Sequence, residues 1–560
     1  MGLTNNKKPN GVVKDKRAKA VSPLLEEDYV GKWLCEKGPY QEYIKALSGS
    51  NPGLMQPDPA NKKIPLINGL ATVVLLEAGS TGKTSFTPHS FRSASKLKEH
   101  FDKTDDKHNS RRVYIMEGLA PDYVAVIGGH FFMDPTFFQR QERSCVWSND
   151  FTPTSDALPQ PSLLDPDKMY QIQYCELRQF TEEMENAPYF CARTGRHVGM
   201  TKARASQAEI TTTGILRRKA GFWCRETSRG GWDAVILCDP QLHDVLKSGT
   251  QVSPRPISEP FQKGYIDFLP PASYRDMMKR PAHPHTSMLV DLQHYFINHA
   301  NALDTPAASS PNSPTSPSIP TVLTSSPPRP DWTRPQTASI FLKKIVAAHY
   351  LQLADYIKAM LPSLELQFET AWKDEQDQWK SLQTISRRCG NYCDDMEDSL
   401  LSLGYSLKGP EGTHVRDWRD VEKDFQYIYY RLGVLKSRAD TLMQAMTGLA
   451  SIAGNRQNLE EAKRVKRLNL LALLFIPLAY TSSLFSMQDS YAPGAKQFWV
   501  YWVCGIGAAA FTFALTWLLG SALDDAARWT LGPWKLFFWN KSRRIKKVKR
   551  VRTIYGGSKK

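Results

Sequence analysis

The sequence has few cysteines for its length, and they are unevenly placed. Nine occur among 560 residues: Cys35, Cys145, Cys175, Cys191, Cys224, Cys238, Cys389, Cys393 and Cys504. An odd, sparse set excludes a dense disulfide framework, and we expect reduced cytosolic thiols. The N-terminal stretch MGLTNNKKPN lacks the apolar core of a secretory signal, so we expect residues 1–60 to form a disordered basic tail.

Motifs of the common enzyme classes are also missing. We find no nucleophile elbow, HExxH pair or kinase signature, and we therefore expect that the protein is not an enzyme. Gly82-Lys83-Thr84 is similar to the end of a phosphate-binding loop. However, Glu77 stands where that motif needs a glycine, because backbone amides must wrap the phosphates there. We expect a polar, hairpin-like turn instead.

Metal-ligand spacing is absent around two suggestive pairs. His283 and His285 lie close together in the sequence, as do Cys389 and Cys393. Neither pair has a nearby partner set at the spacing of a zinc site. We expect solvent-exposed histidines and small packing thiols.

Negative charge is in deficit. Lys and Arg number 72 and Asp and Glu 56, which gives a formal net charge of +16. This balance favours an acidic partner, either nucleic acid or an anionic membrane.

Two long uncharged apolar runs lie near the C-terminus. Leu468 to Met487 reads LNLLALLFIPLAYTSSLFSM, and Phe498 to Leu519 reads FWVYWVCGIGAAAFTFALTWLL. A helix of about 20 residues matches a hydrocarbon core of about 30 Å. Each run could also be a buried core helix, but two of them joined by so short a link favour a multi-pass integral membrane protein.

The flanking charges predict the orientation. Lys463, Arg464, Lys466 and Arg467 precede the first run, whereas the connecting loop holds only Lys496 and Asp489 as charged residues. We expect both termini in the cytosol, most readily at the plasma membrane, with an internal membrane as the alternative. The basic tail carries Lys541, Arg543, Arg544, Lys546, Lys547, Lys549, Arg550 and Arg552. These side chains would bind the anionic inner leaflet, and we expect no nucleic-acid partner.

A long helix is predicted before the first run. Apolar residues recur at steps of three and four in the seam Trp418, Val421, Phe425, Ile428, Leu432, Leu435, Ala439, Leu442, Met446, Leu449 and Ala453. This spacing is typical of a coiled coil. A second stripe comprises Phe368, Trp372, Trp379, Leu382, Cys389, Met396, Leu400 and Leu403, and Gly404 to His414 would supply the turn of a helical hairpin. No proline lies between Glu411 and Ile476, so one helix can run from the cytosol into the membrane.

The fold class that follows is an α/β cytosolic domain, then a helical hairpin with a coiled-coil stalk, then two C-terminal transmembrane helices. Strands are expected at 71–76, 112–116, 169–174, 221–225 and 234–237, and helices at 122–127, 135–142 and 287–299. The expected parts are the tail 1–60, the α/β domain 61–303, a Pro/Ser-rich disordered linker 304–337, the hairpin and stalk 338–467, the transmembrane pair 468–520 and the basic tail 521–560.

Polar residues at the end of the first run indicate a pore. Thr481, Ser482 and Ser483 place hydroxyls at successive angles, and a homo-oligomer of first helices could turn some of them toward a wet axis. The helix would end near Met487, with its carbonyls and negative dipole end at the outer mouth, where cations are attracted. The alternative is that such hydroxyls bond back to their own turn.

Three neighbouring features belong to the same hypothesis. Gln488 would add a ring of carboxamide oxygens, and Asp489 is the one acid of the outer loop. Pro477 frees a carbonyl within the span and is expected to kink it.

At these residues the sequence resembles the CorA-type magnesium transporters, particularly their divergent fungal members. The resemblance is carried by Asn455 to Asn458 and by Leu470 to Gln488, and more weakly by Arg111 to Gln141 and Gly230 to Pro240. It implies a homopentamer with a pore lined by the first span, which carries magnesium or another divalent cation and holds no tightly bound cofactor. The family's Gly-Met-Asn signature falls on Ser486, Met487 and Gln488, where only the methionine matches.

The resemblance also implies gating by divalent ions bound between cytosolic domains. Two acidic groups could serve, namely Asp394, Asp395, Glu397 and Asp398, or Asp374, Glu375 and Asp377. The alternative for both is a solvated helix face. The rival function for the whole chain is a non-conducting, membrane-anchored scaffold that uses its linker and basic tail to bind partners.

Overall fold

The structure is a computed structural model, and it describes most of the chain outside the termini. The described residues are 30–58, 64–79, 85–104, 109–143, 160–181, 184, 187–202, 212–247, 251–253, 258–270, 273–300, 332, 334–365, 372–408, 417–486, 494 and 496–526. The chain divides into two compact units, Met1–Met446 and Thr447–Lys560.

A mixed β-sheet forms the centre of the first unit. Its strands are β1 (Thr72–Ala78), β2 (Thr87–Phe91), β3 (Arg111–Glu117), β4 (Met169–Phe180), β5 (Tyr189–Cys191), β6 (His197–Lys202), β7 (Thr212–Glu226), β8 (Trp232–Cys238), β9 (Val245–Lys247), β10 (Gln251–Ser253) and β11 (Ser258–Pro260). The order is β10-β9-β5-β6-β7-β8-β3-β1-β2, and β4 pairs with both β7 and β11. The β3–β8 pair is parallel, and the other described pairs are antiparallel.

The five predicted strands are confirmed, and several are longer than the sequence indicated. β4 and β7 extend to 12 and 15 residues, and the whole of β4 pairs with residues 212–223 of β7. β1 and β2 pair antiparallel, with Glu77 opposite Thr87. Gly82, Lys83 and Thr84, for which a polar, hairpin-like turn is predicted, lie outside the described residues.

Both faces of the sheet are buried at β1 and β8, which explains the uninterrupted apolar runs Val73–Leu76 and Ala234–Cys238 in these strands. In β1, Val74 and Leu76 belong to one buried cluster, whereas Val73 and Leu75 belong to another. The same alternation separates Ile236 from Val235 and Leu237 in β8, since successive side chains point to opposite faces.

Four helices cover the first face: α1 (Pro39–Ser48), α2 (Ala94–Lys103), α3 (Pro121–Phe131) and α4 (Thr136–Glu142). α1 differs from the expectation of a disordered tail over 1–60. Its Tyr40 is buried against Gly128 of α3, where an added Cβ would lie 2.4 Å from the ring, and the Tyr40 hydroxyl donates to the Met133 carbonyl at 3.0 Å. This contact between distant parts of the chain orders residues 30–58, and composition alone does not show it.

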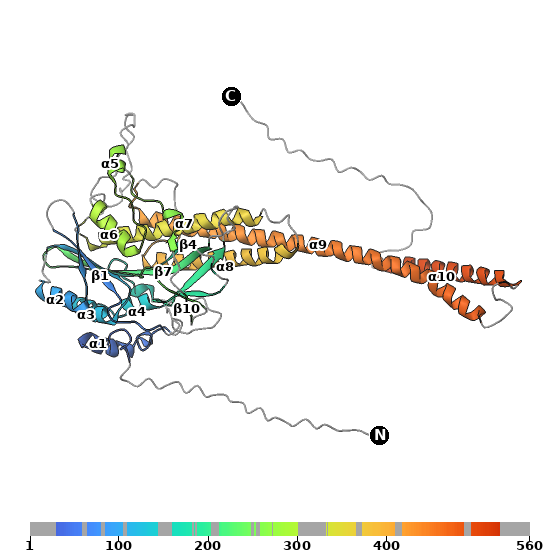
Figure 1. Cartoon of the computed structure of the whole chain (residues 1–560), viewed down its shortest axis with the longest axis horizontal. Coiled ribbons are helices and arrows are strands. Elements are labelled where there is room, and N and C mark those ends of the chain that lie inside the picture. Colours follow the sequence, from blue (N-terminus) through green and yellow to red (C-terminus); the bar gives the residue numbers. More distant parts are fainter. Residues whose placement is uncertain are drawn as a thin grey trace, which may run out of the picture. The chain divides into compact units, whose positions relative to one another are not determined.

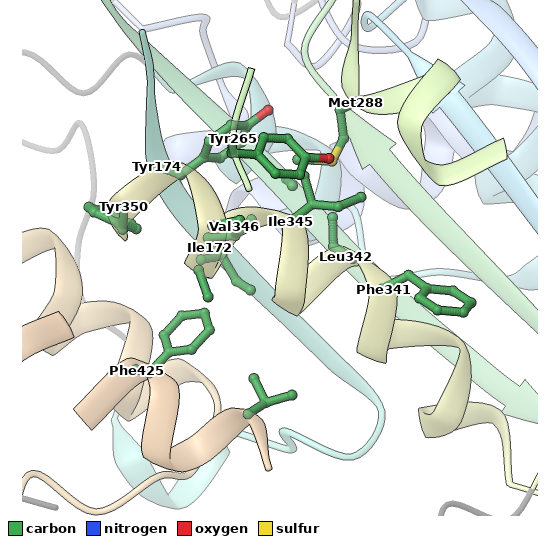
Figure 2. Close-up of a cluster of buried hydrophobic side chains, with 14 of the residues drawn as sticks. Ile172, Tyr174, Tyr265, Met288, Phe341, Leu342, Ile345, Val346, Tyr350 and Phe425 are labelled. Atoms are coloured by element: carbon green, nitrogen blue, oxygen red, sulfur yellow. The ribbon is translucent and has the colours of Figure 1, made fainter. Parts of the chain in front are cut away.

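The second face is covered by α6 (Met288–His299), α7 (Ser339–Glu365), α8 (Trp372–Ser402) and the start of α9 (Val421–Phe485). Figure 2 shows Leu342, Ile345 and Val346 of α7 in one buried cluster with Ile172 of β4 and Phe425 of α9. α7 was not predicted from the sequence as a separate helix. α5 (Tyr274–Lys279) and four short 3-10 helices, Pro52–Leu54, Pro161–Leu163, Phe261–Lys263 and Pro335–Ala338, complete the unit's described elements.

The end of the expected linker packs into this face. Trp332 is buried, and its ring stacks on that of Trp232 with centroids 6.3 Å apart, while the Trp232 indole nitrogen donates to the Trp332 carbonyl at 2.8 Å. The first residues of the linker, 304–331, lie outside the described residues.

The helical hairpin and the apolar seam are confirmed in the first unit. Leu382, Cys389, Met396 and Leu400 of α8 are fully buried, and the α9 seam is buried or partly buried from Val421 to Met446. Leu449, the next seam position, is 53% exposed. α9 continues without a break to Phe485, as the absence of proline before Ile476 predicted, and α10 (Phe498–Ala526) follows.

Candidate functional site

The second unit contains two helices that are long and apolar enough to cross a membrane. They are α9, through its C-terminal part, and α10 over Phe498–Leu518. Only 11% of the most apolar window of each helix is buried within the chain. A core helix of a soluble protein would be mostly buried, so these exposed apolar surfaces favour contact with lipid or with other copies.

Thr481 lies where α9 packs on α10. Its side chain is 6% exposed, and its hydroxyl donates to the Leu478 carbonyl at 3.0 Å. On α10, a Cβ added to Gly505 would lie 3.4 Å from the Thr481 Oγ1. Thr481 therefore faces α10 and bonds back to its own turn, which was the alternative left open by the sequence.

The opposite face of α9 carries small and hydroxyl side chains. Ala479, Ser482, Ser483 and Ser486 are all exposed. At about 100° per residue they fall on the half of the helix turned away from Thr481. The backbone N–H of Ser486 donates to the Ser482 carbonyl at 2.9 Å, so this face is helical up to its end.

A groove lies between the two apolar helices beside Pro477. Its volume is about 740 Å³, and Leu473, Ile476 and Tyr480 of α9 face Phe511 and Leu515 of α10 across it. The Thr512 and Thr516 hydroxyls of α10 donate to the Ala509 and Thr512 carbonyls at 2.8 and 2.7 Å. The groove is therefore apolar. α9 remains helical through Pro477.

Several predicted site residues lie outside the described residues. These are Met487, Gln488 and Asp489, which follow α9 in the sequence, and the basic positions at 541–552. Ser486 is the last described residue of the predicted pore end.

The acidic group at 394–398 is not entirely the solvated helix face that was the alternative for it. Asp394 is exposed, but Asp395 is only 7% exposed. Burial raises the pKa of Asp395 to about 7, although the nearby charge of Arg217 opposes this. Side-chain positions of Asp374, Glu375 and Asp377 are outside the described part of the chain.

The expectation of solvent-exposed histidines is wrong for His283 and His285. Both are half-buried, and with Asp291 they form a group whose ligand atoms all lie within 4.8 Å of one another. Asp291 follows soon after the pair in the sequence. A small cavity is lined by His285, Asp291 and also His349 of α7, which lies far along the chain. Local spacing could not reveal that partner. Cys389 is buried and Cys393 is half-buried, and both are free thiols, which confirms their packing role.

Comparison with known proteins gives a fold-level likeness only. No protein-family model matches the chain, and no curated protein matches it. Among solved structures, the chain is similar to the complete structure of the CorA magnesium transporter from Methanocaldococcus jannaschii. The identity is 9% and the TM-score 0.32, and the match covers 79% of this chain and 96% of that chain.

The fold places the chain among proteins that join an α/β domain to candidate membrane helices. A mixed α/β domain is followed by long helices, and two candidate membrane helices stand near the C-terminus.

Proposed function

We propose that the chain is a membrane transporter for a divalent metal cation, with magnesium as the first candidate. Several copies would bring their first apolar helices around one axis. The observation that carries the proposal is the group of exposed hydroxyl side chains at the end of α9, in the stretch of that helix that is long and apolar enough to span a membrane and is largely uncovered within the chain.

An oligomer is needed because two helices cannot enclose an aqueous path. Near the C-terminal end of α9, the face turned away from Thr481 carries the small residues Ala479, Ser482, Ser483 and Ser486, which allow close approach of helices in a bilayer. Because Thr481 packs against α10, Ser482, Ser483 and Ser486 would be the hydroxyl residues that line the water-filled pore. The family resemblance of the sequence suggests five copies.

The electrostatics suit a cation. The last backbone carbonyls of each α9 have no hydrogen-bond donor within the helix, and the negative end of the helix dipole lies there. Several such ends, with Gln488 and Asp489 beside them, would attract a hydrated divalent ion. An inside-negative potential would drive the ion inward with about 4.6 kcal/mol per 100 mV. The proposed activity is passive transport without a covalent step, by a protein that is not an enzyme.

Flux into liposomes tests the proposal. We expect purified protein to admit Mg²⁺ to a dye-loaded lumen when the lumen is negative. Ser483→Leu places a larger apolar side chain on the proposed axis, and we expect it to lower the rate at least about tenfold, or about 1.4 kcal/mol in the barrier. Gln488→Ala should also change the rate. The assay would be repeated with Zn²⁺, Ni²⁺ and Co²⁺ to rank the cations.

Thr481→Val is the matched control. It removes a neighbouring hydroxyl on the face that packs on α10 and keeps the shape of the side chain, so the rate should stay near that of the wild type. If wild type and all variants give the same signal as empty liposomes, the transport proposal is wrong and a non-conducting scaffold is favoured.

A further inference from the structure

A cluster of metal-ligand side chains lies in the first unit, remote in sequence from the apolar helices. His283 and His285 stand in the loop between α5 and α6, and Asp291 lies in the first turn of α6. Ser287 caps this helix by accepting a hydrogen bond from the Val290 N–H, which fixes where the first turn begins. The ligand atoms of the two histidines and Asp291 lie within 4.8 Å of one another.

An ion-sized cavity adjoins the cluster. Its volume is about 20 Å³, and Glu176, His285, Asp291 and His349 are among its lining residues. About 10–15 Å³ suffices for one water-sized particle. The cavity is therefore large enough for a single ion or water and too small for a phosphate.

Three polar atoms at this place are buried without a hydrogen-bond partner. They are the Nδ1 atoms of His285 and His349 and the Oδ1 of Asp291. Asp291 is 2% exposed, and its other oxygen accepts a hydrogen bond from the Tyr265 hydroxyl at 2.9 Å. Buried polar atoms nearly always have partners, so three unsatisfied ones around a single cavity indicate a place where an ion or a water molecule can bind.

The backbone holds His285 at the cavity at a conformational cost. Its φ is 49°, a region that non-glycine residues seldom adopt. Its ring occupies the space beside Gly264, where an added Cβ would lie 2.3 Å from the imidazole. Gly264 itself has a φ of +112°, which a side chain would disfavour. Strain of this kind persists where the surroundings impose it, often at binding sites.

The ligand set identifies the class of ion. Imidazole nitrogens with one carboxylate suit Zn²⁺ and neighbouring first-row metals, whereas Mg²⁺ prefers oxygen ligands and retains its waters. Arg178 also lines the cavity, and it shares the Glu176 carboxylate with Arg218: Arg178 Nε lies 3.5 Å from Glu176 Oε1, and Arg218 Nε lies 2.9 Å from Glu176 Oε2.

We propose that His283, His285 and Asp291 bind one divalent transition-metal ion, with Zn²⁺ as the representative, inside the first unit. The fourth position is open to water, and His349 faces it from α7. Tetrahedral ligands at about 2.0–2.1 Å from zinc lie about 3.4 Å apart, so the side chains draw together on binding. The ion would tie the loop before α6 to that helix. The proposal does not depend on the proposed transport function.

Zinc binding to the full-length protein in detergent, without an affinity tag, tests the site. The wild type would be stripped with a chelator, dialysed against Zn²⁺ and measured for bound metal and apparent Tm. We expect His285→Asn and Asp291→Asn to bind one equivalent less per chain and to lose the zinc-dependent rise in Tm. Asparagine tolerates the positive φ of position 285, and at position 291 it can still accept the Tyr265 hydrogen bond.

His89→Ala is the matched control, because His89 is an exposed histidine on β2. It should keep the wild-type zinc content, and Mg²⁺ should not replace Zn²⁺ in any of the four proteins. Co²⁺ should give a tetrahedral visible spectrum in the wild type that His285→Asn lacks. Equal zinc content in all four proteins, or no zinc equivalent in the wild type, would overturn the proposal. If Asp291→Asn fails to fold, the comparison between His285→Asn and His89→Ala decides.

Discussion

At the scale of single residues, the environment changes the chemistry that a side chain can perform. Asp395 stands in an acidic stretch of α8, yet it is buried while its neighbour Asp394 is exposed. Thr481, Ser482 and Ser483 are consecutive hydroxyls, yet only Thr481 packs on α10. In both cases one step along a helix moves a side chain by about 100° and into a different surrounding.

The raised pKa of Asp395 predicts a pH dependence of stability. Its folded pKa of about 7 exceeds the unfolded value of 3.8, so the folded state binds the proton more tightly. This contribution is complete below about pH 4 and is lost as the pH rises through about 7, at about 1.4 kcal/mol per pKa unit. We expect Asp395→Asn to gain apparent Tm over the wild type as the pH increases from 5 to 8.

Thermal unfolding followed by intrinsic fluorescence at several pH values measures this difference. Asp394→Asn, at an exposed position on the same helix, is the control and should follow the wild type. If the difference in apparent Tm between the wild type and Asp395→Asn stays constant from pH 5 to 8, then Asp395 does not titrate in that range.

At the scale of elements, α9 changes its surroundings along its length. Its seam packs on the first unit's core as far as Met446, and beyond that point Leu449, Ile452, Leu459 and Val465 are exposed. A single helix therefore has one part whose apolar residues are covered within the chain. Its other part needs lipid or further copies to cover it.

Two truncations on α9 distinguish these parts. Ile428 is fully buried, and Ile428→Ala should cost about 2–5 kcal/mol through lost burial and the cavity left behind. Leu449→Ala, at a 53% exposed position, should cost under about 0.5 kcal/mol in the stability of the α/β unit. Apparent Tm values of the two variants test the contrast. Equal losses would mean that the seam is covered beyond Met446.

At the scale of the whole molecule, the proposed function requires several chains. Each apolar helix of the second unit has only 11% of its most apolar window buried within one chain. A bilayer covers part of this surface, but the hydroxyl face of α9 is polar and would be costly in contact with lipid. Association of copies through this face removes that cost.

Native mass spectrometry of the detergent-solubilised protein tests this requirement. We expect a homo-oligomer, with five copies as the stoichiometry that the sequence resemblance implies. Introduced cysteines at Ser483 should cross-link between copies, whereas cysteines at exposed Trp517 of α10 should do so less. Monomers alone, under conditions that preserve the fold, would contradict a pore built from α9.

The sequence by itself determined the features that repeat locally. The short apolar runs of β1, β3 and β8, the three-and-four spacing of α9 and the two long uncharged apolar runs are visible without a structure, because each is a pattern among residues that are close in the sequence. Only the tertiary structure decided that Tyr40 orders α1, that Thr481 turns toward Gly505, and that His285 meets His349 at a cavity. These facts depend on contacts between residues far apart in the chain. No local period specifies such contacts, because they arise only when separate elements pack together.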